Sequence, residues 1–161
     1  MPDTPAPSPE PKRLPVLLRR AWYGLNQAFR QRVAPLGITP DQFSILRWLS
    51  EGDPRGLTQR TLTNLMASDP NTITSTLSRM EAAGLIARHP HETDRRARRV
   101  QILSAGRKTF EQARQVAQEL QEHMLGTLPA AERERFLDRL EAIADACATA
   151  TARPVGRKRD S

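Results

Sequence analysis

Cysteine, aromatic residues and long apolar runs are all scarce in this sequence. Its 161 residues include one cysteine, Cys147, and only 4% are aromatic. A single cysteine excludes an intramolecular disulfide framework and suits a reducing compartment. No apolar run approaches the roughly 18–20 residues that a membrane span requires, and the N-terminus has no apolar signal core. We therefore expect a cytoplasmic protein.

Features typical of enzymes are also missing. The sequence has no serine or cysteine nucleophile beside an evident base, no phosphate-binding loop and no closed set of metal ligands. His89 and His91, with Glu92 and Asp94 nearby, have the chemistry of zinc ligands. A proline separates the two histidines, however, and a loop would enclose a metal poorly. We expect no catalytic residues, no metal and no cofactor.

Basic residues are in excess. There are 25 Lys and Arg residues against 18 Asp and Glu residues, which gives a formal charge of +7 and a sequence pI near 10.9. This balance favours a polyanionic partner, either nucleic acid or an anionic membrane, but does not choose between them.

The length predicts one domain, and helical periodicity organises most of it. Residues 1–12 are rich in proline and are expected to form a disordered tail. Residues 13–36 contain a first long helix, predicted over about 13–34. Thr39 followed by Pro40 is typical of a helix start and predicts the second helix. The end of the chain, residues 151–161, reads as a basic tail.

The next segment predicts a helix-turn-helix. A short helix is expected to start at Thr58, and Asp69 with Pro70 is expected to begin the helix after the turn. Gly84 is well placed to end that helix in a left-handed conformation. Two short helices joined by a tight turn, the second with a polar outer face, are the pattern of this motif.

A β-hairpin is predicted to follow, which makes the region 37–103 a winged helix-turn-helix. Apolar residues alternate at both ends of the segment 85–103, and a polar, proline-containing stretch separates them. Ser104 is expected to cap the next helix, and Gly106 to weaken its first turn. Two long helices, about 104–125 and 130–150, complete a fold that is mainly α with a small hairpin wing.

The helix that starts after Asp69 has two contrasting edges. Its apolar edge carries Ile73, Leu77 and Met80. Its other edge is made of short hydroxyl side chains and one cation, without acidic residues: Thr72, Thr74, Ser75, Ser78 and Arg79. Hydroxyls reach phosphates or base edges without bulk, and arginine can grip guanine. Taken alone, such an edge is more often a solvated face.

The predicted wing is rich in arginine. Five arginines lie within a dozen residues: Arg88, Arg95, Arg96, Arg98 and Arg99. The planar, weakly hydrated guanidinium suits phosphates and the narrow minor groove. Together with the helix-turn-helix and the basic charge, this wing favours double-stranded DNA as the partner. RNA is disfavoured, because the major groove of A-form helices is too narrow for a recognition helix.

The segment 57–106 resembles the MarR (multiple antibiotic resistance regulator) family of winged helix-turn-helix transcriptional regulators. The matching motifs are Leu57-Thr58-Gln59, Arg79-x-Glu81-x-x-Gly84-Leu85-Ile86, Asp94-Arg95-Arg96 and Leu103-Ser104-x-Gly106. Two departures are Thr63, where an alanine is common, and the sequence HPHET before Asp94. The resemblance implies a homodimeric regulator, usually a repressor, that binds a palindromic operator.

The resemblance also implies roles for single residues. Thr74, Ser75, Ser78 and Arg79 correspond to contacts in the major groove and to phosphates. Arg96 matches an arginine placed in the minor groove, with Asp94 as its orienting partner. The full predicted DNA-binding set is Thr72, Thr74, Ser75, Ser78, Arg79, Asp94, Arg95, Arg96 and Arg98.

A homodimer is expected on physical grounds as well. One recognition helix reads only a few base pairs, and a two-fold axis places a second one about 34–36 Å away. The helices in 13–36 and 104–150 have apolar faces larger than a small winged domain can cover. The alternative is that these faces pack only within the chain. Cys147 shares a stripe with Leu140 and Ile143, so we expect it to be buried rather than an oxidation sensor.

A small aromatic or phenolic effector is a further implication of the resemblance. Trp22, Tyr23, Phe43 and Trp48 lie on helices that would line its pocket, although large aromatics on amphipathic helices are usually core residues. The sequence thus predicts a repressor released by such a ligand. The alternative is a winged-helix protein with an architectural or protein-interaction role and no specific operator.

Overall fold

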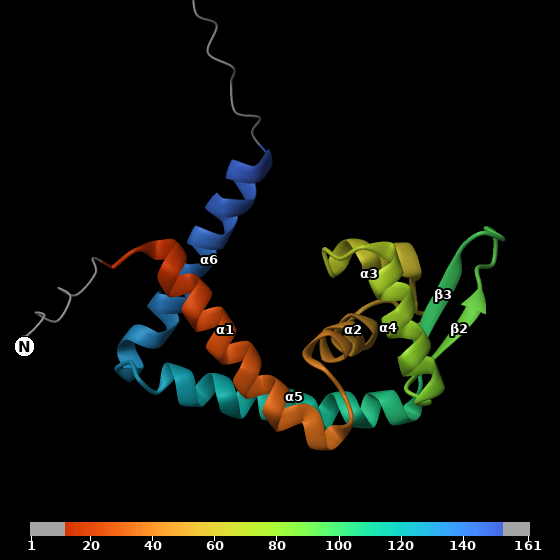
Figure 1. Cartoon of the computed structure of the whole chain (residues 1–161), viewed down its shortest axis with the longest axis horizontal. Coiled ribbons are helices and arrows are strands. Elements are labelled where there is room, and N and C mark those ends of the chain that lie inside the picture. Colours follow the sequence, from red (N-terminus) through yellow and green to blue (C-terminus); the bar gives the residue numbers. More distant parts are fainter. Residues whose placement is uncertain (1–11, 153–161) are drawn as a thin grey trace, which may run out of the picture. The chain divides into compact units, whose positions relative to one another are not determined.

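The computed structural model describes residues 12–152. Except for Lys12, Thr151 and Ala152, the two predicted tails lie outside the described residues. The elements, in chain order, are α1 (Leu14–Val33), the 3-10 turn η1 (Ala34–Leu36), α2 (Pro40–Glu51), β1 (Leu57–Thr58), α3 (Gln59–Leu65), α4 (Pro70–Ala82), β2 (Ile86–Pro90), β3 (Arg98–Ile102), α5 (Ser104–Leu125) and α6 (Ala130–Ala152) (Figure 1). The predicted fold class, mainly α with a small hairpin, is confirmed.

The predicted helix starts depend on side chains that satisfy the first free backbone N–H groups. The Thr39 hydroxyl accepts from the Gln42 amide at 3.2 Å, and the Gln42 side chain accepts from the Thr39 amide at 3.0 Å. Thr58 caps α3, and Asp69 caps α4. Gly84 has a φ of +71° and follows α4, as its position in the sequence predicted.

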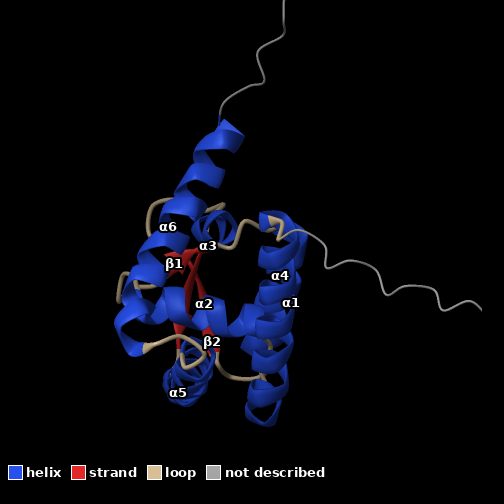
Figure 2. Ribbon diagram, turned by 90° about the vertical axis from the view of Figure 1, so that its left-hand side faces the viewer, coloured by secondary structure: helices blue, strands red, loops and turns tan. Residues whose placement is uncertain are grey.

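The hairpin is confirmed, and it gains a third strand that the sequence did not predict. The strand order is β1-β3-β2, all antiparallel, with Leu57 opposite Val100 and Ile86 opposite Ile102 (Figure 2). Strand β1 has only two residues, too few for an alternating pattern to be visible. Gly56 permits the pairing, because a Cβ there would lie 2.2 Å from the Val100 carbonyl oxygen.

Residues up to Leu120 form one compact unit. Its core takes side chains from α1 to α5, and those of Leu46, Leu62, Leu77, Met80 and Val100 are fully buried. Each contributes about 1.5–3 kcal/mol by leaving water.

Three phenylalanines from distant segments complete this core. The Phe29 and Phe43 rings meet edge to face at 5.0 Å, and Phe43 and Phe110 stack at 5.6 Å. The three rings link α1 and α5 to α2. Helices α1 and α5 are therefore attached to the winged domain.

Two expectations at the start of α5 were wrong. The helix begins at Ser104 itself, and the Leu103 carbonyl accepts from the Arg107 amide at 2.9 Å, so Leu103 occupies the cap position. Gly106 is a packing requirement rather than a weakness. A Cβ at Gly106 would lie 2.1 Å from the Leu85 carbonyl oxygen, so only glycine lets the helix approach the start of the wing this closely.

The second unit starts at Gln121 and consists mainly of α6. None of the α6 side chains that the structure describes is buried, and Phe136 and Leu137 are 44% and 40% exposed. The expectation that Cys147 is buried is therefore wrong for the single chain: its side chain is exposed. An amphipathic stripe buries its residues only when another surface covers it.

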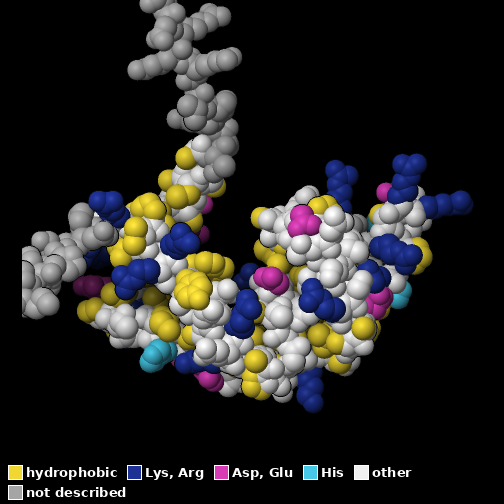
Figure 3. All heavy atoms as spheres, viewed as in Figure 1, with side chains coloured by type: hydrophobic (Ala, Val, Ile, Leu, Met, Phe, Trp, Pro, Cys, Tyr) yellow, Lys and Arg dark blue, Asp and Glu magenta, His cyan; other side chains and the backbone are white. Residues whose placement is uncertain are grey.

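Helix α1 is also apolar on its exposed surface along its N-terminal half. Leu14, Val16 and Leu17 are 44–49% exposed. Figure 3 shows yellow hydrophobic side chains at the surface over this helix. These three side chains are not covered within the compact unit that contains α1. Within residues 12–152, every helix is too short or too polar to span a bilayer.

Candidate nucleic-acid interface

Helix α4 divides its residues between core and solvent as its periodicity predicted. Ile73, Leu77 and Met80 are buried against the winged domain. All five side chains of the predicted polar edge are exposed: Thr72, Thr74, Ser75, Ser78 and Arg79. The structure thus places the predicted major-groove set on one accessible helix.

The first turn of α4 is fixed by Asp69. Its carboxylate accepts from the backbone amides of Asn71 at 3.0 Å and Thr72 at 2.9 Å, and from the Thr72 hydroxyl. The Thr72 hydroxyl, followed by the Thr72 amide, lowers the pKa of the Asp69 carboxyl. Thr72 therefore uses its only hydroxyl proton within the helix and can only accept from a partner outside it.

Thr74 is held by a residue that the sequence did not single out as a site. The Gln59 amide nitrogen, in the first residue of α3, donates to the Thr74 hydroxyl oxygen at 2.6 Å. The Thr74 hydroxyl in turn donates to the Pro70 carbonyl oxygen at 2.7 Å. Gln59 and Thr74 are 15 positions apart, so no spacing rule within a helix could reveal this contact.

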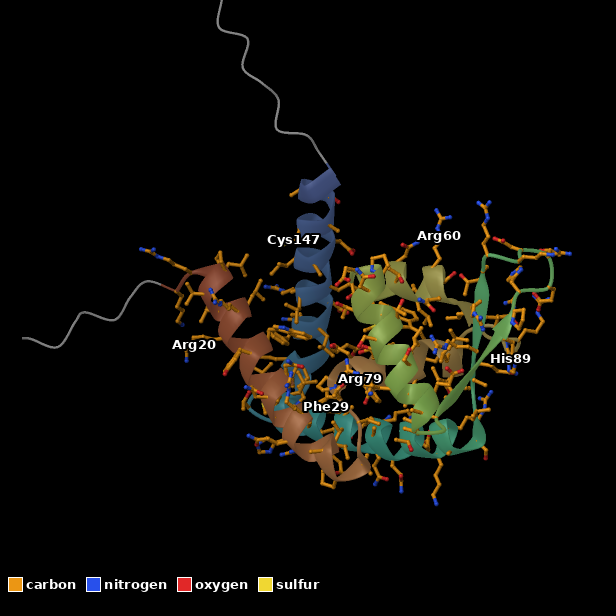
Figure 4. The ribbon with its side chains drawn as sticks, turned by 45° about the vertical axis from the view of Figure 1, so that its right-hand side comes forward. Arg20, Phe29, Arg60, Arg79, His89 and Cys147 are labelled. Atoms are coloured by element: carbon orange, nitrogen blue, oxygen red, sulfur yellow. The ribbon has the colours of Figure 1, made fainter. Side chains whose placement is uncertain are left out.

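Arg79 remains available on the outer face of α4. Its guanidinium lies 3.4 Å from both the Ser75 backbone oxygen and the Ser75 hydroxyl oxygen. These contacts are long for hydrogen bonds, so they hold the side chain only weakly. Figure 4 labels Arg79 on α4 and, on neighbouring α3, the exposed Arg60, which extends away from the fold.

The wing is clamped to α4 by Arg88 and Glu81. Arg88 donates to the Glu81 carboxylate through Nε at 2.9 Å, Nη2 at 2.6 Å and its backbone amide at 3.1 Å. This pairing lowers the pKa of the Glu81 carboxyl. Arg88 also donates to the Ser78 hydroxyl at 3.2 Å. Arg88 is thus a structural residue, and Ser78 lies at the joint between the helix and the wing.

The tip of the wing is a short loop with its own hydrogen bonds. The Asp94 carboxylate accepts from the Arg96 backbone amide at 2.9 Å, and the His91 amide donates to the Ala97 carbonyl at 3.1 Å. Asp94 therefore orients the backbone at Arg96. Arg95, Arg96 and Arg98 are exposed, and within residues 12–152 their side chains make no hydrogen bond or ion pair. Figure 3 shows dark blue basic side chains projecting at this end of the wing.

Arg99 supports the wing from its other side. Its guanidinium donates to the Gly56 carbonyl at 2.9 Å and pairs with the Glu92 carboxylate at 3.1 Å. Of the five arginines in the predicted wing, Arg88 and Arg99 are therefore used internally. His91 lies 3.6 Å from Glu92, and the part of the chain that the structure describes has no group of three side chains suited to a metal.

The four candidate effector residues do not form one group. Phe43 is a core residue, packed between Phe29 and Phe110. Trp48 is half-buried, with the Arg47 guanidinium 5.5 Å from its ring centre. Trp22 and Tyr23 are 67% and 66% exposed and border a shallow surface depression on α1 beside Arg19 and Arg20.

Comparison with known sequences gives two findings. A family model described as the MarR family matches residues 36–97. The transcriptional regulator HosA of Escherichia coli O127:H6 is 30% identical over 126 residues, which cover 75% of this chain and 92% of HosA. The aligned region therefore extends well beyond the winged domain.

Solved structures share the fold at lower identity. A Staphylococcus aureus MepR–DNA complex superposes with a TM-score of 0.77 at 21% identity, covering 84% of this chain and 99% of MepR. MarR from Escherichia coli gives 0.73 at 24% identity, covering 83% and 98%. CouR from Rhodococcus jostii RHA1, bound to p-coumaroyl-CoA, gives 0.71 at 23% identity, covering 83% and 92%. These likenesses show the winged-helix fold over most of the chain.

Proposed function

The chain belongs to the MarR family of transcriptional regulators, and we propose that it is a homodimeric repressor that binds a palindromic operator and is released by a small aromatic effector. One observation carries the DNA-binding proposal: the exposed polar edge of α4 lies on the helix to which the arginine-tipped wing is clamped. The family's members regulate transcription and are not enzymes. The proposed location is the cytoplasm, where such a regulator meets its operator.

In this proposal, α4 enters the major groove. Ser75 and Ser78 contact phosphates or base edges, and Arg79 reads a guanine through its two donors. The hydroxyls of Thr72 and Thr74, whose protons are used within the protein, accept from amino groups of bases. The weak contacts of Arg79 with Ser75 support this role, because little is lost when the guanidinium turns toward a base. The buried apolar edge of α4 keeps the helix fixed during binding.

The wing reaches the adjacent minor groove. Arg96 is the proposed minor-groove residue, and Asp94 orients it through the backbone amide. Arg95 and Arg98 supply phosphate contacts beside it. Their exposed guanidinium groups make no hydrogen bond or ion pair within residues 12–152. This supports these roles, because an internal ion pair would have to break before DNA could bind.

A homodimer would cover the apolar faces of the long helices. Leu14, Val16 and Leu17 on α1 and Phe136 and Leu137 on α6 are at least 40% exposed in the single chain. Exposed apolar surface of this extent is typical of a protein–protein interface. A two-fold pair would also present two copies of α4, as a palindrome requires.

The effector proposal rests on exposed aromatic surface beside basic side chains. Trp22 and Tyr23 flank a depression with Arg19 and Arg20, which would suit an aromatic ligand bearing a negative charge. CouR is described bound to p-coumaroyl-CoA, a thioester of a phenolic acid. Phe43 would act only as core support in this proposal, because its ring is buried.

Fluorescence anisotropy tests the proposal directly. The full chain is titrated onto labelled DNA from the region upstream of its own gene and onto a shuffled duplex, at several salt concentrations. We expect tighter binding to the native fragment that persists as salt rises, because base contacts do not depend on counterion release. p-Coumarate and benzoate are then added to the preformed complex, and release is expected.

The outcomes separate the parts of the proposal. Equal binding to both duplexes that collapses with salt would contradict operator recognition at this locus and favour an architectural or protein-interaction role. If binding is specific but neither compound reverses it, the proposed operator recognition stands and these two compounds are excluded as effectors.

A further inference from the structure

We propose that Gln59, the first residue of α3, is a specificity-determining residue of the DNA surface, which fixes Thr74 and reads one base pair with the free edge of its amide. The inference rests on the proposed DNA-binding function. It adds a residue from the first helix of the motif to a reading surface otherwise assigned to α4 and the wing.

The hydroxyl proton of Thr74 is already used within the protein. A threonine hydroxyl has one proton to donate and two lone pairs. At Thr74 the proton is donated to the Pro70 carbonyl oxygen at 2.7 Å, and one lone pair accepts from Gln59 at 2.6 Å. The hydroxyl therefore has no proton left for a base or phosphate. It can take part in recognition only as an acceptor, and its orientation is set by Gln59.

The Gln59 amide is oriented with its nitrogen toward the Thr74 oxygen. This orientation leaves the Thr74 proton for the Pro70 carbonyl oxygen, so both hydrogen bonds form together. One N–H is used in this contact, which leaves the second N–H and the carbonyl oxygen. Neither has a hydrogen-bond partner within residues 12–152.

The backbone of Gln59 is held as firmly as its side chain. The Thr63 hydroxyl donates to the Gln59 carbonyl oxygen at 2.9 Å, and Thr58, immediately before it, caps α3 and pairs with Arg99 in the sheet. Gln59 therefore projects from a fixed point between the sheet and α4. A side chain that is fixed before binding loses less rotational freedom on contact with a base.

The chemistry of the free edge indicates what it reads. An amide with an adjacent donor and acceptor matches N6 and N7 of adenine in the major groove. Glutamate in the same place has acceptors only, so it cannot donate to Thr74 and would prefer the N4 amino group of cytosine. Glutamine and glutamate have nearly the same shape. Exchanging one for the other therefore changes the hydrogen-bonding groups at position 59 without changing the size of the side chain.

Selection from a randomised duplex library is the test. The full chain and its Gln59→Ala, Gln59→Glu and Thr74→Val variants are used, with Gln112→Ala as a matched control. Gln112 is an exposed glutamine on α5 without a hydrogen bond in the described part of the chain. Thermal melting of each variant confirms that it is folded. The measurement is the base preference at every position of the selected site.

We expect the unmodified chain and Gln112→Ala to select the same symmetric site. Gln59→Ala should lose about ten- to a hundredfold of preference for adenine at one symmetric pair of positions and leave the others unchanged. Gln59→Glu should favour cytosine there, and Thr74→Val should weaken preference at the same positions, because the amide loses its anchor.

Two results would overturn the inference in different ways. If Gln59→Ala and Gln59→Glu select the same site as the unmodified chain, Gln59 does not read DNA, although the proposed function stands. If the unmodified chain selects no site at all, sequence-specific binding itself fails, and the role of Gln59 fails with it.

Discussion

At the scale of single residues, the arginines of the wing illustrate how the same side chain serves two purposes. Arg88 binds the Glu81 carboxylate and the Ser78 hydroxyl, and Arg99 binds the Glu92 carboxylate and the Gly56 carbonyl. Both arginines hold the wing in place. Arg96 extends from a loop whose backbone is fixed by Asp94. The sequence alone does not distinguish the arginines that hold the wing from those available to a partner. The distinction depends on which acidic groups lie near each guanidinium in the folded chain.

Arg96→Ala should weaken operator binding by about ten- to a hundredfold without changing folding or dimer formation, because the lost side chain has no internal partner. Anisotropy titrations on the native fragment measure the affinity, and size-exclusion chromatography with light scattering measures the dimer. Arg107→Ala, which removes an exposed arginine from α5, controls for the loss of net charge. Equal effects of the two variants would remove the wing tip from the mechanism.

Gly106→Ala should destabilise the fold by about 1–3 kcal/mol, because the new Cβ would meet the Leu85 carbonyl oxygen at 2.1 Å. Gly24→Ala is the matched control. A Cβ at Gly24 meets nothing within 4 Å, and alanine in the helix should stabilise it by about 0.5–1 kcal/mol. Urea unfolding curves measure both changes. A neutral Gly106→Ala would show that α5 can shift away from the wing at no cost.

At the scale of elements, an ion pair with three hydrogen bonds joins the wing to α4. Glu81 lies near the end of α4, and Arg88 lies on β2, seven residues later. The chain reverses between them through Gly84, which adopts the left-handed conformation. The reversal brings the two strands of the hairpin beside the recognition helix (Figure 1), and the ion pair fixes their spacing.

Glu81→Gln should lower stability at neutral pH, and the difference from the unmodified chain should shrink in acid. The pKa of Glu81 is lowered in the folded state, chiefly by its hydrogen bond with Arg88. Its stabilisation is therefore complete above the ordinary pKa of 4.5 and is lost as pH falls through the lowered value. Other carboxylates also titrate there, so the comparison is made between the two proteins at each pH.

The measurement is the midpoint of urea unfolding from neutral pH to below 4.5, the ordinary pKa of glutamate. Glu119→Gln on α5 serves as the control, because within residues 12–152 the Glu119 carboxylate accepts only from the Gln115 side chain. A constant gap between Glu81→Gln and the unmodified chain at every pH would contradict the role assigned to the charge of Glu81.

At the scale of the whole molecule, the apolar faces of α1 and α6 set the proposed mode of action. A dimer would bury them and couple two recognition helices, so affinity for DNA would depend on both faces. None of the α6 side chains that the structure describes is buried.

Leu137→Glu should shift the dimer toward monomer by about a hundredfold or more in dissociation constant, because an unpaired carboxylate would be buried at the interface. Operator binding should fall with it. Ala142→Glu is the control, since Ala142 is exposed and lies on a different side of α6 from the apolar stripe. Light scattering across a concentration series measures the equilibrium. A fully dimeric Leu137→Glu protein would place the interface elsewhere.

The sequence by itself determined the local features of this protein. Helix starts at Thr39, Thr58 and Asp69, the left-handed Gly84 and the hairpin with its long tip were all predictable. Each depends on side chains only a few positions apart, and such interactions follow from spacing and residue type. The exposed hydroxyl edge of α4 was predictable for the same reason, as was the family.

Only the tertiary structure decided how distant residues are used. It paired Gln59 with Thr74, placed Phe43 in the core, made Gly106 a close contact and left Cys147 exposed. Strand β1 formed because β3 was there to pair with it. These outcomes depend on which surfaces meet after the chain folds. The sequence pattern of one helix or strand cannot predict these contacts, because the partner residues lie on other elements.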